Sequence, residues 1–183
     1  MKLTLFATLC ATALLALQPL CGNAAKARDG AHDFDFNFGT WHTHIKRLTK
    51  PLSGSADFVE LDGTVTVSKI WDGKGQIEDF EVDGPKGHIQ GMTLFLYNPA
   101  ARQWSQIWAN AKDGMLTPAL IGGFKDERGE LIAQEIEDGR AILVRGVWSE
   151  IKPDSHRFEE DYSDDGGKTW EVVFDAHLNR VKP

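Results

Sequence analysis

The sequence predicts an all-β protein that folds as a single antiparallel up-and-down β-barrel of about ten strands. Apolar and polar residues alternate along successive short runs, which is the period of a strand with one buried face. A turn signal rich in Gly, Pro, Asn or Asp follows each run. No window shows a convincing apolar period of 3.6 residues. A two-sheet sandwich is the alternative, and the barrel is favoured because closure removes exposed sheet edges.

The first 24 residues are expected to be a cleaved signal peptide. Lys2 supplies a positive n-region, and Leu3–Leu17 is apolar but too short for an ordinary membrane span. Small-x-small cleavage sites end at Ala24 and at Ala27. Cys21 raises the alternative of a lipid anchor, but the residues before it lack the small side chains expected there. The mature protein is therefore expected in the periplasm or outside the cell, and no cysteine remains in it to form a disulfide.

The N-terminal half of the mature chain reads as a lead-in followed by consecutive strands. Residues 25–35 are polar without a period and are expected to be flexible, with the barrel domain covering residues 36–183. Aromatic residues at 34–38 anchor the start of the first strand, which ends at about Leu48. After a Pro/Gly/Ser-rich loop, the predicted strands are 58–71, 76–82, 89–97 and 104–110, separated by turns at 72–75, 84–87 and 98–102.

The C-terminal half continues the pattern with strands at 115–124, 130–136 and 141–148 and a closing hairpin at 155–180. The glycines of the hairpin turn, Gly166 and Gly167, can adopt the positive φ that a tight turn demands. On one side of that turn, Phe158, Glu160 and Tyr162 share a face. On the other side, an almost purely apolar row consists of Trp170, Val172, Phe174, Ala176 and Leu178.

The charge of the chain argues against some classes of partner. The formal net charge is −7, whereas nucleic acids and anionic membranes attract basic patches. No stretch after the leader is apolar enough to span a bilayer. A small hydrophobic or amphipathic molecule is the expected partner, and the sequence makes no prediction of oligomeric state.

Several motifs resemble a known group of barrels. Gly39-Thr40-Trp41 resembles the G-x-W opening of lipocalins and other calycins, in which the tryptophan plugs the barrel floor beneath a basic residue of the last strand. That resemblance implies that Trp41 and Arg180 form this contact here. The segments FDFNFGTW, GMTLFLYNPAARQWSQIWAN and VRGVWSEIKPDSHRFEEDYSDDGGKTWE resemble a bacterial calycin-like family of unknown function. The resemblance covers nearly the whole mature chain and implies a lipocalin-like barrel, and it implies no activity. Phe158 departs from the tryptophan frequent in such sequences.

The hairpin turn also fits the S-x-D-x-G-x-T-W pattern that is called an Asp-box in sialidase propellers. Only one copy is present, and the chain is far too short for a propeller. We therefore interpret the pattern as a turn device built around Asp165, Gly167 and Trp170.

Polar residues in the middle of apolar faces indicate a pocket, because burying such groups without partners costs several kcal/mol. Glu160 lies between Phe158 and Tyr162, and Glu78, Gln106 and Gln134 occupy similar places. The predicted ligand-binding residues are Trp104, Gln106, Trp108, Gln134, Tyr162, Phe80 and Met92. The alternative is that the polar groups bond one another and ordered water inside a filled barrel.

Two further functions remain open from the sequence. Glu160, with Glu78, is a candidate general acid/base of a cofactor-free isomerase, cyclase or lyase, its pKa raised by desolvation. No nucleophile elbow, dinucleotide fingerprint or P-loop is present. A structural or protein-binding barrel is the other alternative, and it predicts a filled interior with an exposed apolar patch.

Alternating histidines provide a candidate metal site. His42 and His44 alternate on one predicted strand, and His177 with Asp175 would face them if the first and last strands pair. Their parity places them outside the barrel, so solvated strand faces are the preferred interpretation, and no metal or cofactor is expected. A haem ligand from His44 or His88, by analogy with haem-holding calycins such as nitrobindins, is the alternative.

Overall fold

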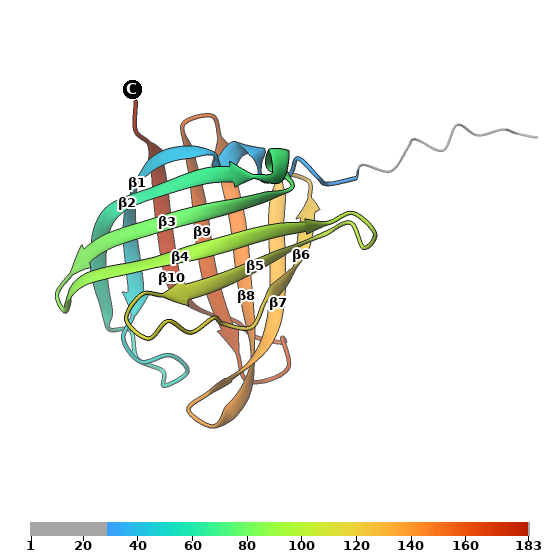
Figure 1. Ribbon diagram of the computed structural model, residues 1–183. Coiled ribbons are helices and arrows are strands. Elements are labelled where there is room, and N and C mark those ends of the chain that lie inside the picture. Colours follow the sequence, from blue (N-terminus) through green and yellow to red (C-terminus); the bar gives the residue numbers. More distant parts are fainter. Residues whose placement is uncertain (1–28, 183) are drawn as a thin grey trace, which may run out of the picture.

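The computed structural model describes residues 29–182, and these form one closed barrel of ten antiparallel strands (Figure 1). The predicted all-β up-and-down barrel is confirmed. The strands are β1 (Gly39–Leu48), β2 (Phe58–Ile70), β3 (Gly75–Gly84), β4 (Gly87–Asn98), β5 (Gln103–Asn110), β6 (Leu120–Lys125), β7 (Arg128–Glu137), β8 (Arg140–Lys152), β9 (Ser155–Ser163) and β10 (Glu171–Arg180). Two short 3₁₀ turns, η1 (Asp35–Asn37) and η2 (Trp71–Gly73), accompany them. The expected signal peptide lies outside the described residues.

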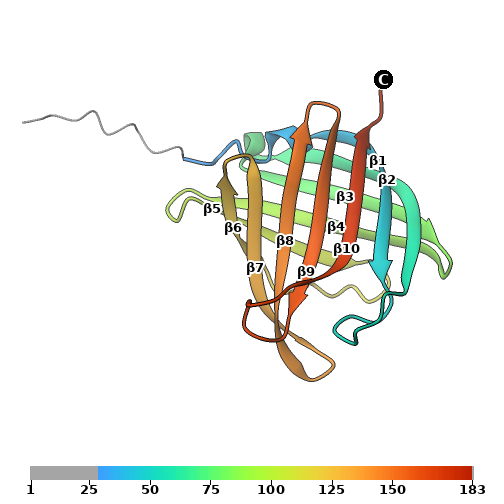
Figure 2. The ribbon, with the colours of Figure 1, turned by 180° about the vertical axis from the view of Figure 1, so that it is seen from behind.

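Every strand pairs with its neighbours in the sequence, and β1 closes the barrel by pairing with both β2 and β10. In the closing pair, Trp41 lies opposite Arg180 and Arg47 lies opposite Phe174. The strands β2–β5 cross the strands β7–β10 steeply on the opposite side of the barrel (Figures 1 and 2). The two-sheet sandwich is therefore not the architecture of this chain. In residues 29–182, no helix is long and apolar enough to cross a membrane.

Two glycines on the inner face allow the strands to coil tightly. A β-carbon on Gly63 of β2 would lie 2.1 Å from the carbonyl oxygen of Glu81, and one on Gly122 of β6 would lie 2.0 Å from that of Glu130. Any larger residue at either position would therefore collide with the backbone of the neighbouring strand. Glycine kinks of this kind supply the curvature that a closed barrel needs.

The floor of the barrel is closed by the residues just before β1. We expected residues 25–35 to be flexible, but within them Phe34 is fully buried and contacts the rings of Phe95, Trp104, Phe124 and Trp148. The indole nitrogen of Trp104 also donates a hydrogen bond to the Gly30 carbonyl at 2.9 Å. Residues 29–35 are thus part of the packed structure.

Arg180 completes the floor in the way that the resemblance to lipocalins implied. Its guanidinium carbon lies 3.9 Å from the ring centroid of the fully buried Trp41. The same guanidinium donates to the carbonyls of Phe36, Phe38 and Pro153. Arg180 therefore ties the start of the barrel to its last strand through both cation–π and hydrogen-bond contacts.

The Asp165 carboxylate organises the β9–β10 turn, as the motif predicted. It accepts hydrogen bonds from the backbone N–H groups of Lys168 and Thr169 and from the hydroxyls of Ser163 and Thr169. These donors hold the pKa of Asp165 well below its usual range, with the backbone N–H of Thr169 as the largest cause. The Ser163 hydroxyl also accepts from the backbone N–H of Gly167, whose φ is 85°.

We expect Asp165→Ala to lower the urea midpoint of unfolding clearly more than Asp164→Ala. Asp164 is an exposed neighbour whose carboxylate accepts a hydrogen bond from Arg140 at 3.3 Å. Because the folded-state pKa of Asp165 is depressed, its contribution is present above the unfolded-state pKa of about 4 and is lost as the pH falls through the lower folded-state value. Equal midpoints for the two variants at neutral pH would show that the turn does not depend on this carboxylate.

A β-bulge in β10 corrects one detail of the predicted hairpin. The register with β9 shifts between Val172 and Phe174, so that Val173 is buried while Val172 is exposed. Trp170, before the bulge, therefore lies outside the apolar row that we predicted for it. Its ring instead stacks with the guanidinium of Arg145, at 4.1 Å. The extra residue of a bulge moves the side chains that precede it to the opposite face from the one that strict alternation predicts. The sequence pattern alone does not reveal such a bulge.

Candidate functional site: a cavity inside the barrel

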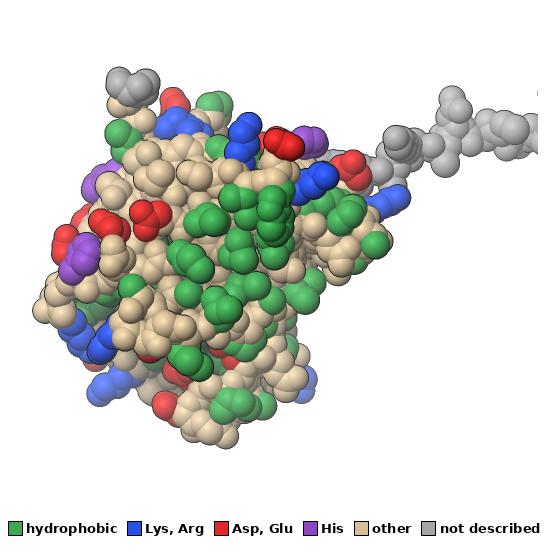
Figure 3. Space-filling view, viewed as in Figure 1, with side chains coloured by type: hydrophobic (Ala, Val, Ile, Leu, Met, Phe, Trp, Pro, Cys, Tyr) green, Lys and Arg blue, Asp and Glu red, His purple; other side chains and the backbone are tan. Residues whose placement is uncertain are grey.

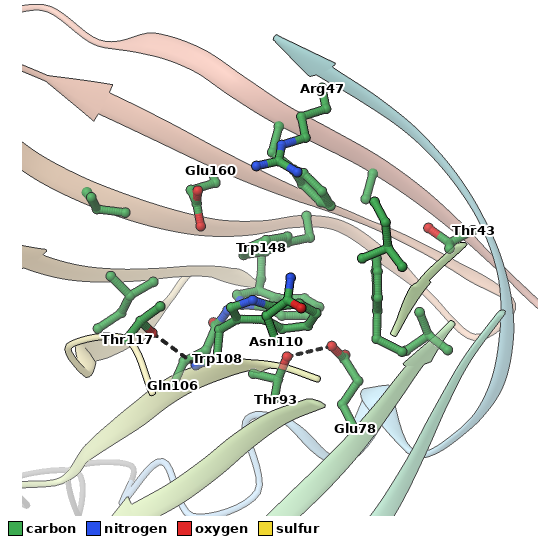
Figure 4. A pocket seen from close by; sticks show the side chains of 18 of the residues that line it. Thr43, Arg47, Glu78, Thr93, Gln106, Trp108, Asn110, Thr117, Trp148 and Glu160 are labelled. Atoms are coloured by element: carbon green, nitrogen blue, oxygen red, sulfur yellow. Dashed lines mark hydrogen bonds between the residues drawn. The ribbon is translucent and has the colours of Figure 1, made fainter. Parts of the chain in front are cut away.

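The barrel encloses a cavity of about 260 Å³ to which all ten strands contribute side chains (Figure 4). For scale, an apolar protein cavity of about 150 Å³ is large enough to bind benzene. The exposed side chain of Arg47, near the end of β1, lies at the end of the cavity that reaches solvent. The lining combines aliphatic and aromatic side chains with buried polar ones, as in small-molecule sites.

The inner end of the cavity rests on Trp148 and Gln106. The indole nitrogen of Trp148 donates to the side-chain carbonyl of Gln106 at 3.0 Å, and both residues are buried. This bond holds the Gln106 side chain with its carbonyl turned toward Trp148. The amide nitrogen of Gln106 is the remaining donor that this residue offers at the cavity wall.

Glu78 of β3 is a buried carboxyl on one wall. The hydroxyl of Thr93, from the adjacent β4, donates to it at 2.7 Å (Figure 4). Burial raises the pKa of Glu78 from 4.5 to about 7, although the bond from Thr93 opposes the shift. Near neutral pH this carboxyl therefore exists both as an acid and as a carboxylate.

Glu160 of β9 projects from a different wall, as Figure 4 shows. Burial, together with the nearby carboxyl of Glu135 from β7, raises its pKa to about 7, whereas a hydrogen bond with Tyr162 and the charge of Arg47 oppose the shift. Burial and the neighbouring carboxyl of Glu160 also raise the pKa of the Tyr162 phenol. The cavity thus holds two separate carboxyls whose protonation changes near neutral pH.

Trp108 is positioned by a glycine on the neighbouring strand. A β-carbon on Gly91 would lie 2.4 Å from the indole of Trp108, so the absence of a side chain there makes room for the ring. The indole also meets the ring of Phe80 edge-on, with centroids 5.2 Å apart. Its backbone is held by the β5–β6 loop, residues 111–119. The backbone N–H of Trp108 donates to the Thr117 hydroxyl, and the N–H of Thr117 donates to the Trp108 carbonyl.

Six of the predicted site residues line this cavity: Glu160, Glu78, Gln106, Trp108, Tyr162 and Phe80. Trp104 faces inward but lies beyond the cavity, where it packs against Phe34 in the floor. The prediction that Gln134 and Met92 face the interior is wrong, because both are exposed on the outer surface.

The outer surface of the barrel explains those two errors. Across β3–β7 it carries its own apolar patch, which is visible in Figure 3 and includes Ile77, Met92, Ile121 and Ile132, each more than a third exposed. Ile77 lies opposite Leu94, which lies opposite Ile107, so the patch runs across neighbouring strands. A strand with apolar residues on both faces gives no alternation from which the inner face can be read.

Several lining residues were not identified from the sequence. Thr93, Arg47, Glu135 and Trp148 contribute polar or aromatic groups to the cavity. Glu135 lies on the same face of β7 as the inward-facing Leu131 and Ala133. A prediction that this face of β7 points inward would have identified it. Arg47 and Thr93 carried no distinctive signal, because their role depends on the register with neighbouring strands.

The histidines considered as metal ligands lie on the outer surface. His44 and His177 face each other across β1 and β10, and the Nδ1 atom of His44 is 2.9 Å from an Asp62 oxygen. Asp175 is engaged by the guanidinium of Arg157 at 2.7 Å and 3.0 Å. In the part of the chain that the structure describes, no cluster of three or more His, Cys, Asp or Glu side chains is arranged to hold a metal ion.

Comparisons with known proteins support the barrel fold but assign the chain to no family. No family model matches the sequence, and no curated protein sequence matches it. The S-type phycobiliprotein lyase CPES from Guillardia theta is similar in structure, with a TM-score of 0.55 and 13% identity over 82% of this chain and 91% of that one. A de novo designed fluorescence-activating β-barrel matches with a TM-score of 0.44 and 15% identity over 84% of this chain and 99% of that one. At such low identity the likeness to the lyase shows the fold alone.

Proposed function

We propose that this chain binds a small hydrophobic or amphipathic molecule inside the barrel. The observation that carries the proposal is the cavity of about 260 Å³, which combines aromatic walls with the inward-facing polar groups of Glu78, Gln106 and Glu160. A barrel with a purely structural role would be filled by its own side chains at this position. From the sequence motifs we also propose that the chain belongs to the calycin-like family of unknown function and, from its predicted signal peptide, that it acts in the periplasm or outside the cell.

Native mass spectrometry of the protein purified gently from its own host tests this proposal. We expect a discrete adduct that disappears on denaturation. The adduct should be lost in Ala176→Phe, which fills the cavity from β10, and retained in Ala141→Phe, which adds the same ring on the exposed face of β8. A bare chain mass for the wild-type protein, or an adduct that Ala176→Phe retains, would contradict binding in the cavity.

A second candidate function is acid/base catalysis on a molecule bound in the same cavity. The observation that favours it is that two carboxyls, Glu160 and Glu78, line the cavity, each with a pKa of about 7. A general base works best when its pKa lies near the working pH. Such a group can remove a proton next to a carbonyl, as an isomerase or lyase requires.

Deuterium exchange into a panel of aromatic ketones in D₂O, followed by NMR, separates catalysis from binding. An enzyme should accelerate the exchange, and Glu160→Gln should abolish the acceleration while the ketones still bind. Glu60→Gln, on the exposed face of β2, is the matched control and should exchange at the wild-type rate. Exchange that persists in both Glu160→Gln and Glu78→Gln would exclude these carboxyls as the base.

A further inference from the structure

The charged side chains of the cavity are mostly acidic. Three carboxyl side chains line it, Glu78 from β3, Glu135 from β7 and Glu160 from β9, against a single cation, Arg47. Glu135 and Glu160 lie close enough that the charge of one raises the pKa of the other. Arg47 is exposed at the mouth, where water screens its charge more than it screens groups inside the barrel. The interior is therefore a poor environment for an anion.

We propose that the ligand of this cavity is an organic cation, a protonated amine on an apolar body, whose charged group lies between Glu160 and Glu135. This inference rests on the proposed binding function and adds the charge of the ligand to it. An ammonium group has three N–H donors and no acceptor. It therefore matches the carboxyl oxygens that Glu78, Glu135 and Glu160 present at the cavity wall.

The hydrogen bonds already present leave these acceptors available. The Thr93 hydroxyl uses one oxygen of Glu78, and the Tyr162 hydroxyl bonds to the Glu160 carboxyl. A carboxylate has about four lone-pair sites, so each of the two retains capacity for a further donor. Directly across the sheet from Glu160, the partners are Gly146 on β8 and Phe174 on β10, and neither offers it a charge.

The aromatic walls suit the same ligand. Trp108, Phe80, Phe158 and Phe174 all line the cavity. Their rings bury an apolar body, and a ring face attracts a nearby cation through its quadrupole. A combination of aromatic faces with carboxylates is a common way to recognise an amine. An acidic ligand would instead need cationic side chains inside the cavity.

The charge of the ligand has a consequence for the pH dependence of binding. The charged and titratable groups that act on Glu160 are Glu135, Tyr162, Asp161 and Arg47, and Glu137 acts on Glu135. Because the pKa of Glu160 lies at about 7, raising the pH through this range creates the carboxylate that a cation prefers. A cation should therefore bind more tightly as the pH rises, and a ligand that accepts a proton from the neutral acid should bind less tightly.

Three probes with one apolar body test the inference: naphthylmethylamine, naphthylmethanol and naphthoate, titrated by calorimetry at about pH 6 and about pH 8. We expect the amine to bind about tenfold more tightly than the alcohol at the higher pH, and naphthoate to bind most weakly. Glu160→Gln should bring the amine and the alcohol to within about threefold, and should remove the gain in amine affinity between the two pH values. Glu60→Gln should change neither.

The possible results distinguish an error in the inferred charge of the ligand from a failure of the proposed binding function. If the alcohol or naphthoate binds as tightly as the amine, and Ala176→Phe abolishes that binding, the cavity is a ligand site but the inferred charge is wrong. The same holds if the preference for the amine survives in Glu160→Gln. If no probe binds the wild-type protein, or if Ala176→Phe leaves all affinities unchanged, both the inferred charge and the proposed binding function are overturned.

Discussion

At about pH 8.5, Glu78→Gln should make the protein more stable than the wild type by about 3 kcal/mol, whereas at about pH 4 the two should be equally stable. The wild-type protein at the higher pH carries a carboxylate in a site where burial raises the pKa from 4.5 to about 7. A glutamine has the same shape and still offers an oxygen to the Thr93 hydroxyl, but it has no charge to bury. Urea unfolding at both pH values measures the difference.

The direction of this effect follows from which state loses its proton first. As the pH rises from about 4.5, the unfolded chain ionises before the folded one, so the free energy of unfolding falls until the pH passes about 7 and is level above it. The exposed Glu60→Gln provides the control and should leave the difference from wild type independent of pH. If the difference in stability between Glu78→Gln and the wild type is the same at every pH, then the pKa of Glu78 is not raised in the folded barrel.

Phe34→Ala should lower the free energy of unfolding by about 3–5 kcal/mol, the range found for deleting a fully buried aromatic ring. Phe34 has no exposed surface and contacts four other aromatic rings of the floor within 5.4 Å between centroids. Its removal leaves a cavity beneath Trp148, which forms the inner end of the ligand cavity. Chemical denaturation monitored by tryptophan fluorescence measures the loss.

The matched control for that variant is Phe58→Ala, because the Phe58 ring at the start of β2 is 46% exposed. We expect it to cost less than about 1 kcal/mol. Similar losses for Phe34→Ala and Phe58→Ala would mean that the residues before β1 do not seal the floor. A large loss for Phe34→Ala alone would establish that the barrel domain begins before Asp35.

The sequence by itself determined the strands, their order and several contacts. Alternation and turn residues define elements through short-range geometry, so ten strands joined in sequence followed from local patterns. The Asp165 turn was also predicted, because it belongs to a compact motif, and the Trp41–Arg180 contact was implied by the resemblance to lipocalins. Glu160 was identified as an inward-facing residue because its own strand has one apolar face, with Phe158 and Tyr162 beside it.

Only the tertiary structure decided which face of the less amphipathic strands points inward. Gln134 and Met92 lie outside because β4 and β7 carry apolar residues on both faces, so their orientation is set by register with neighbouring strands. The bulge in β10 turned Trp170 outward, and Phe34 became part of the core only through rings far away in the sequence. Burial and the proximity of Glu135 set the pKa of Glu160 near neutrality, and both arise only when the barrel closes and brings separate strands around one cavity.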